Sequence, residues 1–433
     1  MFKFNLRRNK LLQFGVISLT ALTLAACGGE TSGSNSPSTT EDGKVQIEFW
    51  TTDEENYAEL VAEFEEQHPD IDVVASYHGG YDEMAQKIQA AVVAKNLPDV
   101  AQLGQRHAIP QIADSGQLIP IEELIDQDTI DDIHSQLWDR FRYKDQLWTI
   151  PFESSTPVLY YNKTLFEEHG VKVPETWDEL VQAAEALTID EDGDGTNEVW
   201  GFNMAKDTPW YIQPMAWNRG AKLINEDGTV DLNSPEMVET IESFKDIVHE
   251  RKAMPINQHN TADDDFKAGK LALFYKSGAS FQGIVRDVGD SFEVGTTFLP
   301  AVDERNVPIG GNSLGVFKSS DEEQEASLKL VEFLTSTEKV AEISMATGYI
   351  PVRQSAMELQ EFKDHLEEFP NAKVTIDQME FLYGQPINPS DSLIWNELVT
   401  ILEMVEQDQD ADVQKILDQL QKKVSQFLED YQG

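Results

Sequence analysis

The stretch GNSLG at residues 311–315 has the G-x-S-x-G spacing of a serine hydrolase nucleophile. In that motif the serine stands at a sharp turn from a strand into a helix, which exposes its hydroxyl to a substrate. The residues that follow Ser313 are apolar, and the next helix start comes only at Ser320. We therefore expect Ser313 to lie in a strand, and we predict no catalytic serine here.

Metal and acid-base patterns are also weak. The 8 histidines include no H-x-x-x-H pair of the metalloprotease type. In DEDGDGTNEVWG, Asp190, Asp192, Asp194 and Gly195 fit the first half of a calcium loop, but Gly201 stands where that loop needs a glutamate. We interpret this segment as a polar hairpin turn, with a structural calcium site at 190–201 as the alternative. The sequence therefore predicts no enzyme, no metal site and no cofactor.

The remaining chemical groups are small hydroxyls, amides, aromatic rings and exposed backbone N–H groups near predicted turns and strand ends. Such groups suit a neutral polyol, because rings pack on its C–H faces and uncharged partners hydrogen-bond its hydroxyls. Each aromatic taken singly is more often a core residue than a ligand contact. The candidate ligand-binding residues are Tyr81, Gln105, Ser155, Trp210, Ser277, Gly311 and Tyr349.

The elements that would position these residues follow from hydrophobic periodicity. Residues 44–52, 71–77 and 98–103 read as strands, and amphipathic helices are predicted between them, at 53–67 and 81–96. Alternating strands and helices are typical of a parallel α/β sheet, in which ligands bind beyond the carboxyl ends of the strands. Trp50, Tyr81 and Gln105 lie near such ends and are candidates for one wall of a cleft.

Later helices carry explicit start signals. Thr176 with Glu179, and Ser320 with Glu323, have the spacing of a capping box. The segment 413–430 is predicted to be a further amphipathic helix. We find no internal repeat and no transmembrane segment after the N-terminal signal. A chain of 433 residues is too long for one ordinary core, so two lobes are expected.

The chain is strongly acidic. The 78 acidic residues against 33 basic ones give a formal net charge of −45. A polyanion is repelled by phosphate backbones and anionic lipid, so we predict no nucleic-acid partner. The charge is explained either by an ordinary solvated surface or by adaptation to saline or alkaline surroundings.

The N-terminus contains a targeting pattern. Basic residues within 3–10 precede an apolar run that is short for a membrane span and ends in TLAAC. This pattern is similar to a bacterial lipoprotein signal over residues 1–27, in which Cys27 receives lipid, typically including palmitate, and becomes the mature N-terminus. Cys27 is the only cysteine, so no internal disulfide can form. Residues 28–44 are polar and are predicted to be a flexible tether.

Five stretches carry a family resemblance. PFESSTPVLYYNK (151–163), IGGNSLGVF (309–317) and TGYIPVR (347–353) resemble solute-binding proteins of bacterial ABC importers, with support from SYHGGYDE (76–83) and ALFYKSGAS (272–280). The similarity is greatest to the glycerol-3-phosphate-binding branch of the carbohydrate group. It implies a periplasmic-binding-protein-like α/β fold: two lobes joined by a multi-strand hinge, with the ligand cleft between them. The expected N-terminal lobe is 45–153 with 302–346, and the C-terminal lobe is 154–301 with 347–433.

The resemblance also implies function and partners. It predicts a monomer on the cell surface, held to the outer face of the cytoplasmic membrane by its lipid anchor. This protein captures a small solute by cleft closure and delivers it to the permease subunits. Carried over by motif, the ligand contacts are Tyr81, Ser155, Ser277, Gly311 and Tyr349, with Trp210 as a stacking platform. A secreted polysaccharide hydrolase or a surface carbohydrate adhesin is the alternative.

Two departures from the branch leave the ligand open. Gln105 stands where the branch has a glutamate for the glycerol hydroxyls. Ser390 or Asp391 stands where it has an arginine for the phosphate, and a carboxylate at that position opposes phosphate binding. Arg353 is the alternative cation. The ligand is therefore either a sugar or oligosaccharide, or a glycerol-3-phosphate-like compound.

Overall fold

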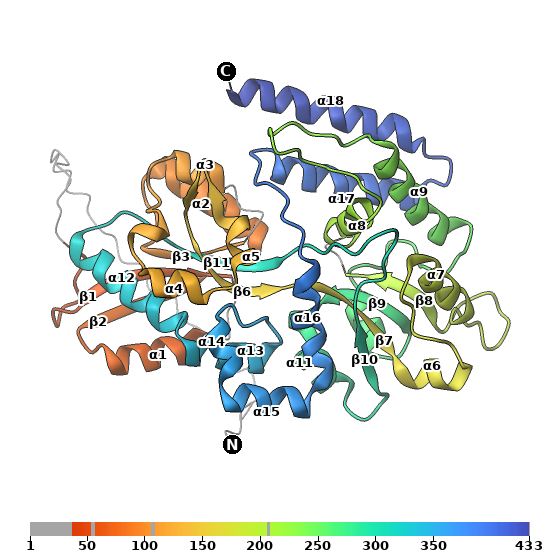
Figure 1. Ribbon diagram of the computed structural model, residues 1–433, viewed down its shortest axis with the longest axis horizontal. Helices are drawn as coiled ribbons and strands as arrows, with labels where there is room; N and C mark the ends of the chain where they lie inside the picture. The colour runs from red at the N-terminus through yellow and green to blue at the C-terminus, as the bar shows by residue number, and fades with distance from the viewer. Residues whose placement is uncertain (1–36, 53–56, 105–108, 206–207, 433) are drawn as a thin grey trace, which may run out of the picture. The chain divides into compact units, whose positions relative to one another are not determined.

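The computed structural model describes residues 37–52, 57–104, 109–205 and 208–432 (Figure 1). The predicted signal peptide, the lipidation site Cys27 and the candidate Gln105 lie outside these residues.

The first sheet has five strands in the order β2-β1-β3-β11-β6. The first three strands in sequence, β1, β2 and β3, pair in parallel as predicted, whereas β11 is antiparallel to both of its neighbours. Helices α1 and α2 connect the parallel strands, as the strand–helix alternation predicted. The bounds are β1 Val45–Thr51, α1 Tyr57–Gln67, β2 Ile71–Tyr77, α2 Tyr81–Ala94, β3 Val100–Gly104, β6 Ile150–Ser155 and β11 Gly310–Val316.

The second sheet has four strands in the order β10-β7-β9-β8. Strand β7 pairs antiparallel with β9 and β10, while β8 and β9 are parallel. The bounds are β7 Pro157–Asn162, β8 Trp200–Met204, β9 Leu271–Ser277 and β10 Val294–Thr297.

A single residue, Thr156, separates β6 of the first sheet from β7 of the second. Strand β7 is buried on both faces. Val158 and Tyr160 pack into one hydrophobic cluster, whereas Leu159 and Tyr161 face another. The stretch 151–163 is therefore the point at which the chain passes from one sheet to the other.

Gln378 ties this crossing to two other segments. Its side-chain Nε2 donates to Thr156 Oγ1 at 2.8 Å and to the Pro157 carbonyl at 2.7 Å, and its Oε1 accepts from Leu299 N at 2.8 Å. Gln378 is completely buried. Three chain segments distant in sequence are thus joined through one amide.

Helices surround the two sheets. Both predicted capping boxes are present, at α7 and at α12. Helices α8, α9, α17 and α18 pack on one another. The remaining bounds are α3 Ile109–Asp114, η1 Ile121–Glu123, α4 Gln127–Asp132, α5 Ser135–Trp138, η2 Asp139–Phe141, β4 Arg142–Tyr143, β5 Gln146–Leu147, α6 Lys163–His169, α7 Trp177–Ala186, α8 Thr208–Trp217, α9 Pro235–His249, α10 Ala262–Lys267, η3 Gly278–Ser280, α11 Phe281–Val288, α12 Asp321–Leu334, α13 Thr337–Thr347, α14 Gln354–Glu358, α15 Gln360–Glu368, η4 Pro370–Ala372, α16 Lys373–Asp377, η5 Gln378–Phe381, α17 Asp391–Gln407 and α18 Val413–Gln432.

The hydrophobic core is divided between the two sheets. One large cluster surrounds the first sheet and includes Ile350, Val352 and Phe362 from the later part of the chain. Another large cluster joins the second sheet to the helices α7, α8, α9, α17 and α18. The α/β fold class is confirmed, and the residue limits of the two lobes stay a prediction.

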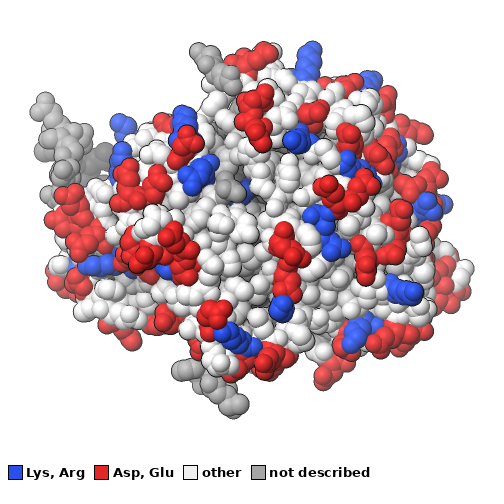
Figure 2. Space-filling view, viewed as in Figure 1, with Lys and Arg blue, Asp and Glu red and all other residues white. Residues whose placement is uncertain are grey.

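The charged surface agrees with the composition. Figure 2 shows acidic side chains spread over the whole visible face, with fewer basic ones among them. Among the described residues, no helix is both long and apolar enough to cross a membrane.

Candidate functional site

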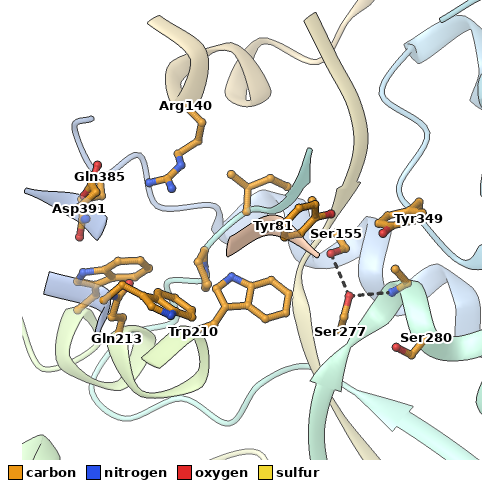
Figure 3. A pocket seen from close by; sticks show the side chains of 17 residues that line it. Tyr81, Arg140, Ser155, Trp210, Gln213, Ser277, Ser280, Tyr349, Gln385 and Asp391 are labelled. Atoms are coloured by element: carbon orange, nitrogen blue, oxygen red, sulfur yellow. Dashed lines mark hydrogen bonds between the residues drawn. The ribbon is translucent and has the colours of Figure 1, made fainter. Parts of the chain in front are cut away.

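A cavity of about 270 Å³ is lined by segments of both sheets and by the helices next to them (Figure 3). Its lining combines hydroxyls, amides, aromatic rings and two charged side chains. The lining residues are Tyr81, Arg140, Ser155, Trp210, Gln213, Trp217, Ser277, Ala279, Ser280, Pro308, Ile309, Gly310, Gly311, Tyr349, Gln385, Asp391 and Trp395.

Six of the seven candidate residues meet in this cavity. Tyr81, Ser155, Trp210, Ser277, Gly311 and Tyr349 all line it, although they are far apart in sequence. The seventh, Gln105, lies outside the described residues. Trp50, which we expected on a cleft wall, is instead buried and stacks on His78 with ring centroids 4.2 Å apart. Trp50 does not line the cavity, because its side chain packs with Met84 and Ile88 of α2 in a hydrophobic cluster.

Two serines define one end of the cavity. Ser155 is the last residue of β6, and Ser277 is the last residue of β9. The Ser277 hydroxyl donates to the Ser155 hydroxyl at 3.0 Å and accepts from Ala279 N at 3.2 Å. Figure 3 shows Tyr81, Tyr349 and Ser280 at the same end. This end offers hydroxyl groups and ring faces.

Two glycines shape the floor between the sheets. Gly311 has φ +103°, and a Cβ there would lie 1.7 Å from the Glu153 carbonyl oxygen. A Cβ on Gly310 would lie 2.3 Å from Cζ2 of Trp210. Only residues without side chains allow β11 to pass so close to β6 and allow the indole of Trp210 to rest on the strand.

Tyr81 and Tyr349, the two tyrosines of the cavity, each come shortly after a glycine with positive φ. Tyr81 begins α2 two residues after Gly79, which has φ +90°, and Tyr349 follows Gly348, which has φ +107°. Behind Tyr349, the backbone N–H of Ile350 donates to the Ser154 carbonyl at 2.7 Å. Tyr349 is therefore fixed relative to β6 by the residue next to it.

The buried side chain of Glu153 forms hydrogen bonds next to the cavity. Glu153 is 5% exposed and accepts hydrogen bonds from the Tyr57 hydroxyl at 2.8 Å and from Asn312 Nδ2 at 2.6 Å. Asn312 Nδ2 also lies 3.4 Å from the Tyr81 hydroxyl. Sequence reasoning missed Glu153, whose only signal was that it is the one charged residue in strand β6.

The other end of the cavity is charged. In Figure 3, Asp391, Gln385 and Gln213 lie opposite the serines, and the guanidinium of Arg140 lies between Asp391 and Tyr81. Burial raises the pKa of Asp391 to about 6, against the opposing effects of the nearby Arg140 charge and of a hydrogen bond from Asn388 N. Burial therefore favours the neutral form of this carboxyl group, whereas the Arg140 charge favours the ionised form.

Ser390, the other residue at the expected arginine position, does not line this cavity. It is completely buried, and its hydroxyl donates to Asn388 Oδ1 at 2.7 Å. Of the two residues expected near the position of the arginine, Asp391 is the one that lines the cavity.

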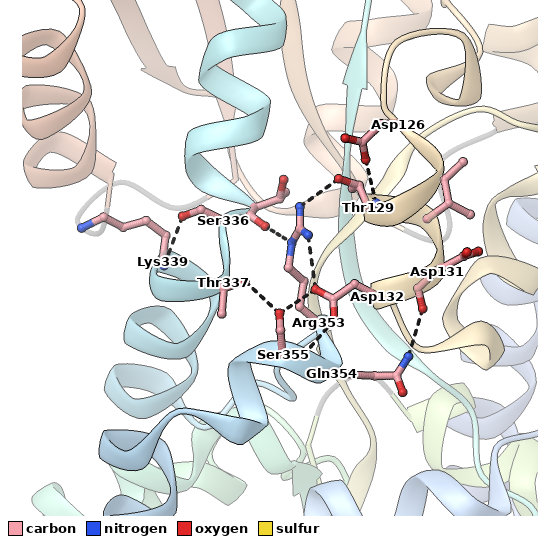
Figure 4. Close-up of polar contacts among 12 residues, drawn as sticks. Asp126, Thr129, Asp131, Asp132, Ser336, Thr337, Lys339, Arg353, Gln354 and Ser355 are labelled. Carbon is pink, nitrogen blue, oxygen red and sulfur yellow. Dashed lines mark hydrogen bonds and ion pairs between the residues drawn. The ribbon is translucent and has the colours of Figure 1, made fainter.

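Arg353 is not the substitute cation. Its guanidinium pairs with Asp132 at 3.3 Å (Figure 4). It also donates to the Thr335 carbonyl. It does not line the cavity. An isolated antiparallel bridge between Arg353 and Ile133 holds the backbone in place. The cation that the structure places in the cavity is Arg140, which sequence reasoning did not find.

The serine motif and the aspartate-rich loop noted in the sequence can both be located in the structure. Ser313 lies in β11, is completely buried and donates to the Leu103 carbonyl at 3.2 Å, as expected for a strand residue. Asp190, Asp192 and Asp194 are exposed, with ligand atoms within 4.8 Å of one another. Both Asp190 oxygens already accept backbone N–H groups, from Gly193 and Gly195. The Ile189–Val199 antiparallel bridge closes this loop as a hairpin.

Comparison with known proteins places this arrangement in context. Residues 59–371 match the family model described as bacterial extracellular solute-binding protein. The sn-glycerol-3-phosphate-binding periplasmic protein UgpB of Escherichia coli strain K12 is 27% identical over 354 residues, which cover 77% of this chain and 80% of that protein.

Solved structures show the same architecture. UgpB from Mycobacterium tuberculosis, in complex with glycerophosphocholine, has a TM-score of 0.78 and 26% identity, covering 90% of this chain and 100% of that one. The maltose/maltodextrin-binding domain MalE from Bdellovibrio bacteriovorus, bound to maltotriose, has a TM-score of 0.78 and 22% identity, covering 89% and 100%. The second likeness concerns the fold alone.

Proposed function

This chain belongs to the bacterial extracellular solute-binding proteins, and from that premise we propose that the cavity captures a small hydroxylated solute for an ABC importer. The observation that carries the proposal is the meeting of Ser155, Ser277, Tyr81 and Tyr349 at one end of a single cavity. Ser155 ends a strand of the first sheet and Ser277 ends a strand of the second. A solute bound to both would bridge the two sheets.

The proposed mechanism is closure around the solute. A ligand shifts a conformational equilibrium only by its differential affinity for the two states. A solute that contacts groups on both sheets favours the state in which those groups are close together, and this is the usual basis of hinge closure. No bond in the solute changes.

The ligand class follows from the lining. Paired hydroxyls and aromatic rings suit a polyol, and the names of similar proteins include binders of glycerol phosphates. Ligand pockets usually measure roughly 300–1,000 Å³. A cavity of about 270 Å³ favours a compact solute over a long oligosaccharide.

Delivery and attachment complete the proposal. Lipidation of Cys27 would hold a monomer on the outer face of the cytoplasmic membrane, with residues 28–44 as a tether. From there the loaded protein would pass its solute to the permease subunits. Labelling cells with a radioactive fatty acid tests the anchor, because Cys27→Ser should abolish incorporation.

The binding experiment is thermal and chemical unfolding of the chain with sugars and with glycerol phosphates. A solute at 100 times its Kd should stabilise the protein by about 2.7 kcal/mol. Ser277→Ala should reduce this stabilisation, whereas Ser291→Ala, at an exposed position, should not. The proposal fails if no solute of either class changes the stability.

A polysaccharide hydrolase needs two carboxylates facing the substrate. Among the described lining residues, Asp391 is the only carboxylate. Release of reducing sugar from any polysaccharide would contradict the proposed role.

A further inference from the structure

The turn that follows strand β9, residues 277–280, supplies part of the cavity wall. Ser277, Ala279 and Ser280 all line the cavity. Figure 3 shows Ser277 and Ser280 at the same end as Ser155 and Tyr349. The position of the turn 277–280 therefore decides where several solute-facing groups lie.

The turn 277–280 is a short 3-10 turn. Ser277 is its N-cap, and the Ala279 N–H donates to the Ser277 hydroxyl at 3.2 Å. At its other end the Phe281 N–H donates to the Gly278 carbonyl. Hydrogen bonds in 3-10 turns have poorer geometry than those of an α-helix. The exact place of such a turn therefore depends on its neighbours.

The Tyr160 hydroxyl contacts this turn from the adjacent strand β7. It lies 2.9 Å from the Ser277 carbonyl oxygen and 3.3 Å from the Gly278 carbonyl oxygen. A phenol has one proton to donate, so the shorter distance identifies the Ser277 carbonyl as the main acceptor. In the ladder Tyr160 is opposite Phe274, so its hydroxyl reaches beyond this pair to the end of β9.

Packing alone does not account for a hydroxyl at residue 160. Tyr160 is completely buried, and its ring packs near Phe266 and Phe274, with centroid distances of 6.2 and 6.5 Å. A phenylalanine would fill the same space. Burial raises the pKa of Tyr160 well above its ordinary value, and the negative charge of Asp263 adds to this effect. The hydroxyl therefore keeps its proton and remains a donor at neutral pH.

The same turn supports Tyr349. A Cβ on Gly348 would lie 2.9 Å from the Gly278 carbonyl oxygen, so Gly348 packs directly on the turn 277–280. Tyr349 is the next residue in the chain. A displacement of the turn would therefore move Ser277 and the backbone support of Tyr349 together.

We propose that Tyr160 is a positioning residue of the solute site, whose hydroxyl holds the turn 277–280 in the place that binding requires. Tyr160 does not line the cavity and acts through Ser277, which does. The inference rests on the proposed function, since it requires the cavity to bind a solute.

Hydrogen exchange of the full chain tests the hold on the turn without any solute. Tyr160→Phe keeps the ring and removes only the hydroxyl. The amides of residues 278–281 should exchange at least about fivefold faster, whereas those of α17 should keep their rates, because the loss is local. Tyr161→Phe is the matched control, since its side chain packs on the other face of β7. Unchanged exchange of the turn in Tyr160→Phe would overturn the inference.

Isothermal titration with sn-glycerol 3-phosphate and with maltotriose tests the effect on binding. Tyr160→Phe should weaken the probe that binds about tenfold, the size expected for one lost hydrogen bond. In a Ser277→Ala background the same change should cost clearly less, because the hydroxyl that Tyr160 positions is already absent. Equal losses in both backgrounds would show that Tyr160 does not act through Ser277 and would overturn the inference.

A third variant separates positioning from a general loss of stability. Ile241 is completely buried in α9, in a different hydrophobic cluster from Tyr160. Ile241→Val removes one buried methyl group and should lower stability without changing the affinity for the probe. A similar fall in affinity in Ile241→Val would assign the effect of Tyr160→Phe to stability and would overturn the inference.

The two proposals fail in different ways. Probe binding that is unchanged in Tyr160→Phe would overturn the positioning role and preserve the solute-binding function. Absence of binding for every sugar and glycerol phosphate would overturn the proposed function and, with it, the role of Tyr160 in binding.

Discussion

Replacing Gln378 by methionine should destabilise the protein more than a change at any exposed glutamine. The buried amide makes three hydrogen bonds, two to the crossing segment at Thr156 and Pro157 and one to Leu299. Methionine has a similar volume but cannot form these bonds, so the Pro157 carbonyl and the Leu299 N–H would both be left without this partner. Each buried group left unpaired costs about 1–3 kcal/mol.

We therefore expect a loss of about 2–6 kcal/mol, a large part of the roughly 5–15 kcal/mol that stabilises a typical domain. Urea unfolding followed by circular dichroism measures this loss, with an unchanged slope if the transition stays two-state. Gln360→Met is the matched control, because Gln360 is exposed and bonds only its helical neighbour Asp364. Its effect should stay within about 0.5 kcal/mol.

A loss below about 1 kcal/mol in Gln378→Met would refute the reasoning. It would mean that the three segments keep their arrangement without the amide, or that water replaces it. Normal stability together with changed solute affinity would give the amide a role in closure instead.

Three further predictions concern the cavity and its surroundings. Tyr349→Ala should weaken solute binding about 10- to 100-fold, as expected for loss of a ring contact, with little change in the melting temperature of the free protein; unfolding of this variant would make the ring part of the core. Asp132→Asn should lower stability above pH 5 without affecting solute affinity. Burial raises the pKa of Asp132, but hydrogen bonds from Ser355 and Arg353 outweigh this effect, so the pKa is lowered overall. The carboxylate therefore stabilises the folded state at neutral pH, and this contribution is lost as the pH falls through the lowered pKa. Chemical unfolding at pH 7 and at pH 3 should show a smaller difference in the variant than in the parent. Gly311→Ala should cost several kcal/mol, because its φ is +103° and the new methyl would meet a backbone oxygen; a fully stable variant would show that β11 can shift.

Much of the fold could be predicted because its signals are local. The helix α1 buries Tyr57, Leu60, Val61 and Phe64, the residues at helical spacing in the sequence. Capping boxes depend on two residues three positions apart, so they can be read directly. The apolar residues after Ser313 identified a strand for the same reason.

The errors came from contacts that the sequence does not display. Period-two alternation suggests one solvent-facing side of β1, and Glu48 on that side is exposed, but Trp50 on the same side is buried against Met84 and Ile88 of α2. Arg353 is close to Tyr349 in sequence, yet its partner Asp132 is remote and draws the guanidinium away from the cavity. Arg140 had no local signal, because its role depends on meeting Asp391 in three dimensions.

The family motifs located the end of the cavity at Ser155 and Ser277 better than its charged end. The five candidates carried over by motif line the cavity together, and Trp210 lies with them. The motifs that carry the hydroxyl and glycine contacts are contiguous stretches, so one sequence suffices to recognise them. The charged end is assembled from isolated residues on η2 and α17, which leave no pattern.

The single residue Thr156 between β6 and β7 fixes which face of the second sheet each β7 side chain occupies. Inserting a residue there would turn each side chain of β7 to the opposite face. Tyr160 would leave the cluster around Phe266 and Phe274, and Leu159 would take its place. Chain length at this junction is therefore as restrictive as residue type, and alignments of related chains should contain no gap here.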